Sequence, residues 1–259
     1  MNNSVDMTQQ AGRAVEVVKS RKYAKLDFAQ SASGLVLALF MWAHMLLVSS
    51  ILIGEEAMFY VTKFLEGKFF FGKSYPIFVS LVAIGVFIIF IVHAAIAVRK
   101  FPNNWEQYKE YRAHMKMMKH GDTSLWFWQI FTGFAMFFLG SIHLYVIMTH
   151  PAEIGPYASS DRVWSEYMWP LYILLLLAVE FHGSIGLYRL AVKWGWFDGK
   201  DPKASRKKLK KAKWIVTVAF LTLGVLSLAA YIKIGIAHKD KVGERYEISS
   251  LLETTRDYI

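Results

Sequence analysis

The sequence contains no cysteine and has few charged side chains. Without cysteine, the chain cannot form disulfides, thiolate zinc sites, iron–sulfur ligation or thioether links to c-type haem. Charged residues make up 19% of the 259 positions, whereas hydrophobic residues make up 55%. This balance is typical of a membrane protein and not of a soluble domain. The first 26 residues contain no apolar run, so we expect no cleaved signal peptide there.

Five apolar segments are each long enough to cross a bilayer as a helix. They cover about residues 27–53, 76–98, 125–149, 168–192 and 214–236. The sequence therefore predicts an all-α membrane protein that folds as a bundle of five transmembrane helices.

The remaining polar segments define the organisation of the chain. We expect an N-terminal arm at 1–26, a membrane domain at 27–236 and a tail at 237–259. Within the membrane domain, 54–75 has the amphipathic character of a segment that lies along the interface. The stretch 99–124 should be partly helical, and the stretch 150–167, punctuated by Pro and Gly, should be a loop.

The net charge of +10 comes from basic residues beside the apolar segments. Most lysines and arginines lie in the N-terminal arm and in the connections 99–124 and 193–213, all on one side of the membrane. The positive-inside rule makes that side cytoplasmic, which puts the N-terminus in the cytoplasm and the C-terminus outside. No aromatic-basic binding module is visible, so we expect no nucleic-acid partner.

Each of the first four apolar segments carries one histidine, at His44, His93, His143 and His182. An unsatisfied polar group in hydrocarbon costs several kcal/mol, so four such residues need a common reason. At about 1.5 Å of rise per residue, His44 and His143 lie toward the outer face, and His93 and His182 lie toward the cytoplasm. The four histidines therefore sort into an outer pair and an inner pair.

Paired histidines at matched depth on different helices are what bis-imidazole haem ligation requires. A single membrane histidine is more often a helix–helix hydrogen bond, but two matched pairs favour two haems b. Small residues near the ligands would admit a flat macrocycle: Ala97, Gly140, Ser141 and Gly186. The other histidines have polar neighbours and should lie at the surface: His114, His120, His150 and His238.

Two of the histidines end the same motif, a Ser or Thr, then Gly, then nine residues, then His. It runs from Ser33 and Gly34 to His44, and from Thr132 and Gly133 to His143. His93 and His182 lack it. We interpret the repeat as marking two helices that serve the same cofactor, the outer haem.

Three stretches carry a resemblance to a known family: AKLDFAQSASG, MKHGDTSLWFWQIFTGFAMFFLGSIHLY and EYMWPLYILLLLAVEFHGSIGLYRLAVKWGWFDG. With the four histidines, they resemble the dihaem cytochrome b subunit of quinol:fumarate reductases and related succinate dehydrogenases. The match is to the single-subunit, five-span type of epsilonproteobacteria. It covers about residues 20–235 and leaves the two termini unassigned.

The resemblance implies a bacterial inner-membrane anchor for anaerobic respiration that oxidises menaquinol. Electrons would pass through an outer haem held by His44 and His143 and an inner haem held by His93 and His182. They would then reach an iron–sulfur subunit and a FAD-containing flavoprotein subunit that reduces fumarate. The missing cysteines agree, because any iron–sulfur centre must lie on a partner. The expected partners are thus these two subunits, the lipid membrane and quinol, and the assembly could be a dimer of heterotrimers.

Two carboxylates are candidate catalytic residues. Glu180 lies inside the fourth apolar segment, two residues before His182, where a carboxylate is costly and a functional role is the default. It could relay protons inward, with a structural hydrogen bond as the alternative. Glu66 matches the family's acidic residue near the quinol site, where a general base must take protons. From the sequence alone, Glu66 is an ordinary loop glutamate.

Haem propionates need cationic or hydroxyl partners near helix ends. Four residues at cytoplasmic ends match family contacts around the inner haem: Gln30, Ser31, Trp126 and Lys193. Arg162, the only cation between residues 150 and 168, could serve the outer haem. For each of these five residues, the alternative to a propionate contact is that the side chain anchors its helix at the membrane interface. We interpret Glu55, Glu56, Asp161 and Glu166 as surface charges.

The sequence leaves other functions open. A succinate dehydrogenase anchor would bind the same groups and run in the reverse direction, from succinate to quinone. A cytochrome b partner of another membrane dehydrogenase would share the haem sites. A transporter with membrane His and Glu as proton sites is disfavoured, because no discontinuous span or inverted repeat is visible.

Overall fold

The computed structural model describes residues 3–118 and 121–248, with side chains from residue 21 onward. Those residues contain helices and no strand. Five helices are long and apolar enough to cross a membrane: α1 (Asn3–Val48), α4 (Ile77–Val98), α6 (Gly121–Thr149), α8 (Trp169–Trp194) and α9 (Pro202–His238). The chain is therefore an all-α membrane protein with five spans, as predicted.

The spanning segments expose apolar side chains over most of their length. In the most apolar stretch of α6, only 6% of the residues are buried, and in that of α4 only 11%. Ile88, Val92 and Phe131 are each about half exposed. In water such a surface would be unfavourable, whereas lipid tails are as apolar as these side chains. The exposed apolar belt is therefore the surface expected of a bundle that lies in a bilayer.

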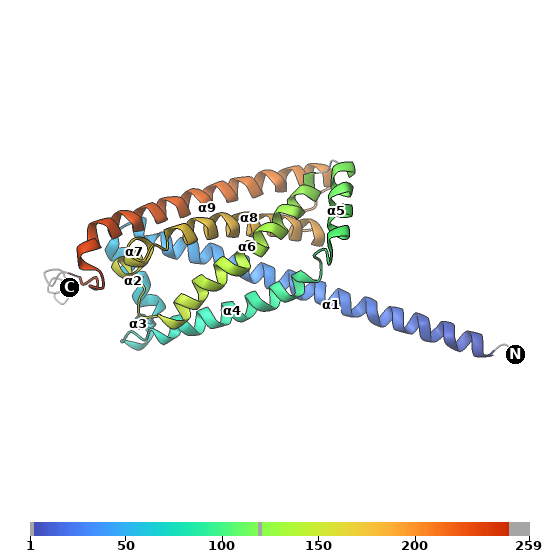
Figure 1. The fold of residues 1–259 in the computed structure, drawn as a ribbon, viewed down its shortest axis with the longest axis horizontal. Coiled ribbons are helices and arrows are strands. Elements are labelled where there is room, and N and C mark those ends of the chain that lie inside the picture. The colour runs from blue at the N-terminus through green and yellow to red at the C-terminus, as the bar shows by residue number, and fades with distance from the viewer. Residues whose placement is uncertain (1–2, 119–120, 249–259) are drawn as a thin grey trace.

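Four of the spans form a closed ring. Helix α1 packs against α4, α4 against α6, α6 against α8, and α8 against α1. Helix α9 lies outside this ring, against α8 and α1 (Figure 1). In this order, α1 faces α6 across the ring, and α4 faces α8. The ring is a four-helix bundle, an architecture that builds cofactor sites from side chains on facing helices.

The two ends of the bundle carry different short helices. Helix α5 (Trp105–Met118) crosses one end, which we call the α5 end (Figure 1). The opposite end, the α7 end, holds α7 (Pro156–Trp164) and the other short helices: η1 (Ser49–Leu52), α2 (Glu55–Leu65), α3 (Lys68–Phe71) and η2 (Lys239–Lys241). The prediction of a helix between 99 and 124 is confirmed. The prediction of a plain loop over 150–167 is wrong, because Gly155 and Pro156 start α7.

A small hydrophobic core closes the α7 end around Ile51, Met58, Val163 and Tyr231. The Tyr231 hydroxyl donates to the carbonyl of Val48 at 3.2 Å, which joins α9 to the end of α1. Helix α1 is continuous across residues 26 and 27, where we expect the membrane domain to begin. Residues 249–259 of the expected tail lie outside the described part of the chain.

Candidate functional site

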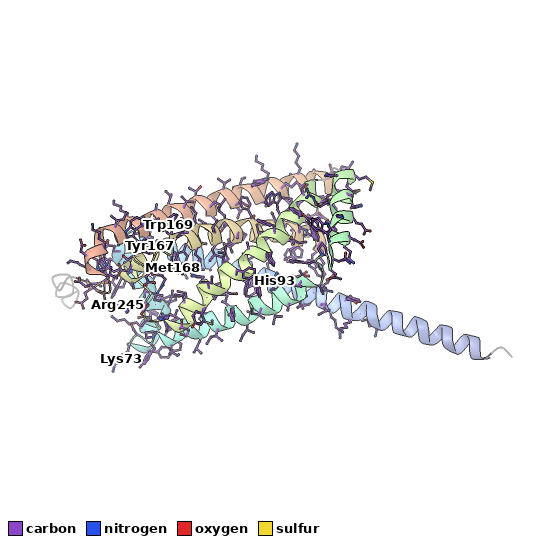
Figure 2. The ribbon with its side chains drawn as sticks, in the orientation of Figure 1. Lys73, His93, Tyr167, Met168, Trp169 and Arg245 are labelled. Atoms are coloured by element: carbon purple, nitrogen blue, oxygen red, sulfur yellow. The ribbon has the colours of Figure 1, made fainter. Side chains whose placement is uncertain are left out.

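The four span histidines come from the four ring helices and meet as two pairs. His44 of α1 faces His143 of α6, with ring centroids 6.1 Å apart. His93 of α4 faces His182 of α8, with ring centroids 6.4 Å apart. Both pairs join helices that lie opposite each other in the ring. His93 lies in the half of the bundle near the α5 end, away from Trp169 at the α7 end (Figure 2).

These separations fit one metal ion between each pair of rings. Metal–imidazole bonds are about 2.0 Å long, so two rings on opposite sides of one ion have centroids about 6.3 Å apart. No group of three or more His, Asp or Glu side chains that could hold a metal ion occurs among the described residues. Each pair offers two imidazoles, which is the number that a bis-histidine haem takes from the protein.

In the inner pair, hydrogen bonds determine which ring nitrogen of each histidine carries the proton. Ser33 Oγ donates to the carbonyl of Ala29 at 2.7 Å, so toward Nδ1 of His93, at 3.0 Å, it acts as the acceptor. His182 Nδ1 lies 2.9 Å from the carbonyl of Gln129, which can only accept. Both Nδ1 atoms therefore carry the proton, and both Nε2 atoms have a free lone pair for a metal.

Two glycines make room for the inner rings. A Cβ at Gly34 would lie 2.9 Å from Cε1 of His93, and a Cβ at Gly133 would lie 2.8 Å from Cε1 of His182. Gly34 and Gly133 belong to the Ser/Thr–Gly motif whose histidines form the outer pair. The two motif histidines do face each other, as the interpretation expects, but the motif also contacts the second pair. Its Ser/Thr–Gly half supports the inner pair, and its histidine supplies the outer pair.

Gln129 also links the inner pair to a half-buried cation. Its Oε1 accepts a hydrogen bond from Arg189 at 2.6 Å, while its carbonyl accepts from His182. A Cβ at Gly186 would lie 2.9 Å from Nε2 of Gln129, so Gly186 gives space to this amide and not to a histidine ring. Gly140 similarly faces the ring of Phe90 at 3.7 Å. Gly186 and Gly140 thus make room for neighbouring side chains and not for the histidine rings themselves.

The outer pair lies among aromatic rings. The His44 ring stacks on Phe40 at 5.8 Å, and the His143 ring lies 5.6 Å from that of Tyr172. Arg162 of α7 is only 3% exposed, interacts with the Tyr172 hydroxyl, and donates to the carbonyl of Glu153 at 2.6 Å. Arg162 is therefore a buried cation beside the outer pair.

Glu180 is completely buried in α8, and neither of its carboxylate oxygens has a hydrogen-bond partner among the described residues. It lies two residues before His182 and eight after Tyr172, so its depth is between the inner and outer pairs. The hydroxyls of Ser184 and Thr217 are also buried and have no hydrogen-bond partner among the described residues. An ionised carboxylate in such surroundings is very costly, which favours the neutral acid or transient ionisation.

Glu66 ends α2 and is 3% exposed, so it is not an ordinary loop residue. Its Oε2 accepts from Lys63 Nζ at 2.7 Å. Its carbonyl accepts from the backbone N–H of Tyr75 at 2.8 Å, which fixes the turn between α3 and α4. The carboxylate is held at the α7 end, on the same side of the bundle as the outer pair.

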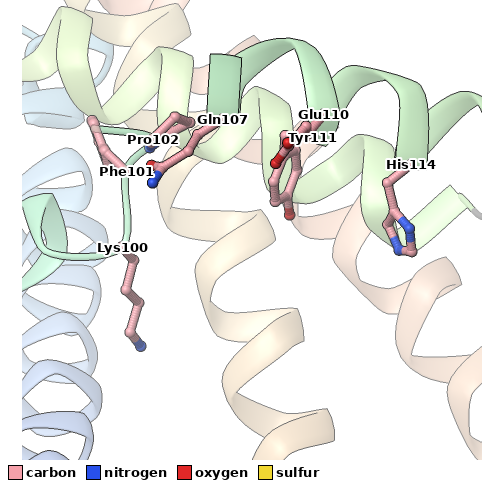
Figure 3. A pocket seen from close by; sticks show the side chains of 7 residues that line it. All are labelled: Lys100, Phe101, Pro102, Gln107, Glu110, Tyr111 and His114. Atoms are coloured by element: carbon pink, nitrogen blue, oxygen red, sulfur yellow. The ribbon is translucent and has the colours of Figure 1, made fainter. Parts of the chain in front are cut away.

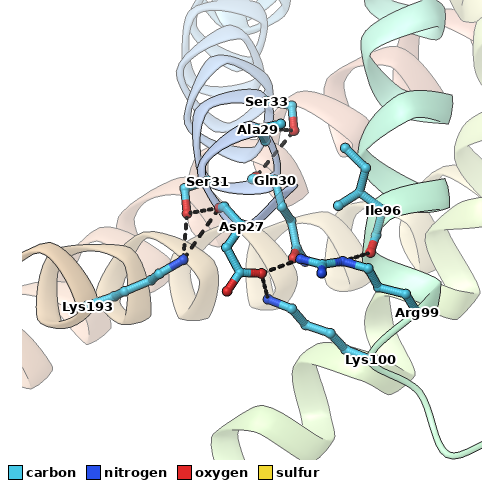
Figure 4. Close-up of polar contacts among 9 residues, drawn as sticks. All are labelled: Asp27, Ala29, Gln30, Ser31, Ser33, Ile96, Arg99, Lys100 and Lys193. Atoms are coloured by element: carbon cyan, nitrogen blue, oxygen red, sulfur yellow. Dashed lines mark hydrogen bonds and ion pairs between the residues drawn. The ribbon is translucent and has the colours of Figure 1, made fainter. Parts of the chain in front are cut away.

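The predicted contacts of the inner haem lie at the α5 end, but not all together. Lys193 Nζ donates to Ser31 Oγ at 3.1 Å, and Asp27 pairs with both Arg99 and Lys100 (Figure 4). Three cations thus surround one carboxylate, which leaves positive charge for a bound anion. The Oε1 of Gln30 is buried without a partner among the described residues.

Trp126 contacts a different element from the cation cluster. Its ring stacks on Tyr111 of α5 at 4.2 Å. Burial raises the pKa of the Tyr111 phenol, and the nearby Arg189 opposes that rise. Arg189, Arg99 and Asp27 were not predicted from the sequence as site residues. Arg189 had a usable signal, because it follows His182 by seven residues and so lies on the same helix face.

Two predictions of surface position are wrong. Asp161 and His238 are 4% and 6% exposed. They form a buried pair at the α7 end, with Asp161 Oδ1 2.9 Å from His238 Nδ1. His114 and His150 are exposed as predicted, and His120 lies outside the described residues.

Comparisons with known proteins identify the family of the chain. A family described as succinate dehydrogenase/fumarate reductase transmembrane subunit matches residues 105–224. The fumarate reductase cytochrome b subunit of Wolinella succinogenes is 53% identical over 240 residues, which cover 93% of this chain and 94% of that protein. The subunit of the same name from Helicobacter pylori strain J99 is 57% identical over 229 residues, 88% of each chain.

The chain belongs to the family of fumarate reductase cytochrome b subunits. The resemblance seen in the sequence is thereby confirmed, and so is the membrane location of the five-span bundle. As a member of the fumarate reductase cytochrome b family, the chain is a membrane subunit of a redox complex. A cytochrome b subunit binds haem, and the two histidine pairs are the side chains of this bundle that would ligate it.

Proposed function

We propose that this subunit oxidises menaquinol at the α7 end and conducts electrons through two bis-histidine haems b to partner subunits that reduce fumarate. The observation that carries the proposal is the pairing of four histidines across one four-helix ring, at 6.1 and 6.4 Å. The partners are an iron–sulfur subunit and a FAD-containing flavoprotein, which fumarate reduction requires and which this cysteine-free chain cannot replace.

The residues that would hold the two groups are on opposite helices of the ring. His93 and His182 would supply their Nε2 atoms at the inner site, since their Nδ1 protons are held by Ser33 and by the Gln129 carbonyl. His44 and His143 would supply the outer site. Bound haem would accept and release single electrons at each pair. Because Gly34 and Gly133 have no Cβ, the His93 ring can lie against α1 and the His182 ring against α6.

Protons released by quinol oxidation need an acceptor. Glu66 is the carboxylate proposed for this role, because it is buried at the α7 end and its Oε2 pairs with Lys63 Nζ at 2.7 Å. Arg162 would bind a propionate of the outer haem, and Ser31 and Lys193 would bind one of the inner haem. Gln30 and Trp126 would complete that inner contact.

Glu180 would carry protons between the two ends. Its position between the depths of the two pairs, without a hydrogen-bond partner among the described residues, suits a carboxylic acid that gains and loses a proton as the neighbouring charge changes. Ser184, four residues after Glu180 on α8, offers a further buried hydroxyl without a partner among the described residues. Inward proton movement would offset the charge carried inward by the electrons.

The α5 end is the proposed docking face for the soluble subunits. Basic residues gather there and would be cytoplasmic by the positive-inside rule, in a bacterial inner membrane. A hollow of about 390 Å³ opens beside α5, lined by residues that include Lys100, Gln107, Tyr111 and His114 (Figure 3). This end also lies closest to the inner pair, so electrons would leave the bundle where the partner binds.

The test is to purify the complex from its native membrane and add a reduced menaquinol analogue. The proposal expects a b-type absorption band that the quinol reduces and that added fumarate reoxidises. Absence of a b-type band would reject both cytochrome roles. A quinol-reduced band that fumarate leaves unchanged, with no flavoprotein in the preparation, would assign the subunit to another dehydrogenase. Comparing the quinol-to-fumarate and succinate-to-quinone rates gives the favoured direction.

A further inference from the structure

A groove at the α7 end belongs to neither histidine pair nor to Glu66. It runs between α2 and the last turns of α9 and has a volume of about 1060 Å³. Its walls combine the carboxylates of Glu55 and Glu56, the ammonium groups of Lys233 and Lys241, and the buried His238. A cavity of this size can hold a ligand with a polar headgroup and part of an apolar tail.

His238 is built into the wall of this groove by a close helix contact. A Cβ at Gly235 would lie 2.6 Å from the carbonyl oxygen of Ser160, so only glycine lets α7 approach α9 this closely. That approach brings Asp161 Oδ1 to 2.9 Å from His238 Nδ1. Asp161 Oδ2 accepts from the backbone N–H of Gly243 at 3.0 Å. Asp161 therefore uses one carboxylate oxygen to hold the imidazole and the other to hold the backbone of Gly243.

The other nitrogen of His238 has no such partner. With Nδ1 donating to Asp161 Oδ1, an imidazole that has one ring proton leaves Nε2 as an acceptor. Nε2 is buried and makes no hydrogen bond within the described residues. Tyr157 stacks on the imidazole at 4.3 Å and prevents the ring from tilting. His238 lines the groove, and a ligand that donates a hydrogen bond to Nε2 would satisfy this atom.

The charged side chains of the groove are arranged by sign. Glu55 and Glu56 belong to α2, whereas Lys233 and Lys241 belong to α9 and η2. Lys233 and Glu56 form no ion pair with any described residue, and the nearest carboxylate of Lys241 is Glu244 at 3.9 Å. Burial and the adjacent Glu55 raise the pKa of the Tyr157 phenol, which keeps it protonated beside that carboxylate. The groove is therefore suited to a zwitterion.

The groove is also lined by apolar residues beside the end of a span that is apolar enough to cross a membrane. Ile51 is 4% exposed in its floor, while Ile53 at its rim is 84% exposed. Ile51 is in the last turn of the span that ends at Leu52, and Ile53 directly follows that span, where lipid headgroups are expected to meet the hydrocarbon. A free polar metabolite would gain nothing from this apolar rim. A membrane lipid would bury its upper acyl chains there.

We infer that the groove binds one phospholipid with a primary ammonium headgroup, of the phosphatidylethanolamine class. The ammonium would donate to His238 Nε2 and lie against Glu55 and Glu56, and the phosphate would lie against Lys233 and Lys241. The acyl chains would follow Ile53 into the bilayer. This site goes beyond the proposed electron path, since it uses none of the residues assigned to haem or quinol.

Related amphiphiles match the groove less well. Phosphatidylcholine has the same charges, but its quaternary ammonium has no N–H to donate to His238. Phosphatidylglycerol can donate from hydroxyls, but it has no positive charge to meet Glu55 and Glu56. A quinol can donate, but it has no charge for either wall. The lost charge-assisted hydrogen bond should weaken binding about tenfold.

The experiment measures lipids bound to the intact purified complex by native mass spectrometry. The complex is exchanged into nanodiscs that contain equal amounts of the ethanolamine, choline and glycerol phospholipids. One tightly retained ethanolamine lipid per subunit, in about tenfold preference over the other two, is the expected result. Retention must survive an excess of soluble phosphoethanolamine. Equal retention of the three lipids, preference for the glycerol lipid, or a retained quinone in place of the lipid would overturn the inference.

Variants locate the lipid in the groove. Lys233→Gln and Glu56→Gln should each reduce its retention, whereas Lys239→Gln and Glu166→Gln remove exposed charges outside the groove and should not. Asp161→Asn should abolish the preference for ethanolamine over choline, because an amide can donate to His238 Nδ1 and turn Nε2 into a donor. Unchanged retention in the Lys233 and Glu56 variants would contradict the site. Haem content and quinol oxidation are measured on the same samples, so failure of the electron path is seen separately.

Discussion

Ser33 Oγ lies 3.0 Å from Nδ1 of His93, although the helix that carries Ser33 supplies its own histidine to the other pair. The same relationship occurs on α6, where Thr132 and Gln129 contact His182 while His143 belongs to the outer pair. Helices α1 and α6 therefore each act at both depths. They support one histidine pair through backbone and hydroxyl groups, and they supply the other pair directly.

This relationship predicts a selective effect of Gly34→Ala. The added methyl would lie 2.9 Å from Cε1 of His93, and overpacking of this kind costs about 1 to 3 kcal/mol. We expect a shifted spectrum and potential for the inner haem only, although His44 is on the same helix. Gly85→Ala is the control, because a Cβ there meets nothing within 4 Å. A shift of the outer haem alone would contradict the assignment.

Glu66→Gln tests the proton acceptor. The amide keeps the volume of the side chain but cannot take a proton, so quinol oxidation should fall at least tenfold, or about 1.4 kcal/mol, with both haems retained. Lys63→Gln removes the 2.7 Å ion pair but leaves the carboxylate, and it should retain far more activity. Steady-state quinol oxidation by the complex is the measurement. Equal losses in the two variants would indicate that the ion pair matters and the proton does not.

Glu180→Gln tests proton movement through the bundle. The buried side chain has no partner among the described residues, so the isosteric amide should fold and bind both haems. Quinol-driven fumarate reduction should fall about tenfold or more, while fumarate reduction driven by a soluble dye that reduces the partner subunits directly should not change. Glu166→Gln, at an exposed position of the α7 end, is the control. Full quinol-driven activity in Glu180→Gln would remove Glu180 from the pathway.

Lys193→Gln tests the cation cluster at the α5 end. Lys193 bonds to Ser31 at 3.1 Å, beside Asp27 and its two partners. Loss of one positive charge near the inner haem favours its oxidised form, and we expect its midpoint potential to drop by about 60 mV, which is tenfold for one electron. The outer haem should keep its potential, since it lies in the other half of the bundle. Spectroscopic redox titration measures both values.

The sequence predicted the depth of the histidines because a straight helix converts residue number directly into position. It also predicted the spans, since length and apolarity decide them. It did not predict the burial of Asp161 and His238, whose neighbours along the chain are polar. Their burial depends on the contact of α7 with Gly235, a tertiary feature that has no local pattern. The double use of the Ser/Thr–Gly motif was hidden for the same reason.

The most direct test of the central claim is a spectroscopic redox titration of the purified complex, combined with haem quantification, for the wild type and two ligand variants. The wild type should contain two haems b per subunit, with two resolved midpoint potentials. His143→Ala should lose one component and His93→Ala the other, each retaining one haem. One haem in the wild type, or loss of the same component in both variants, would contradict a bundle that conducts electrons through two separate histidine pairs.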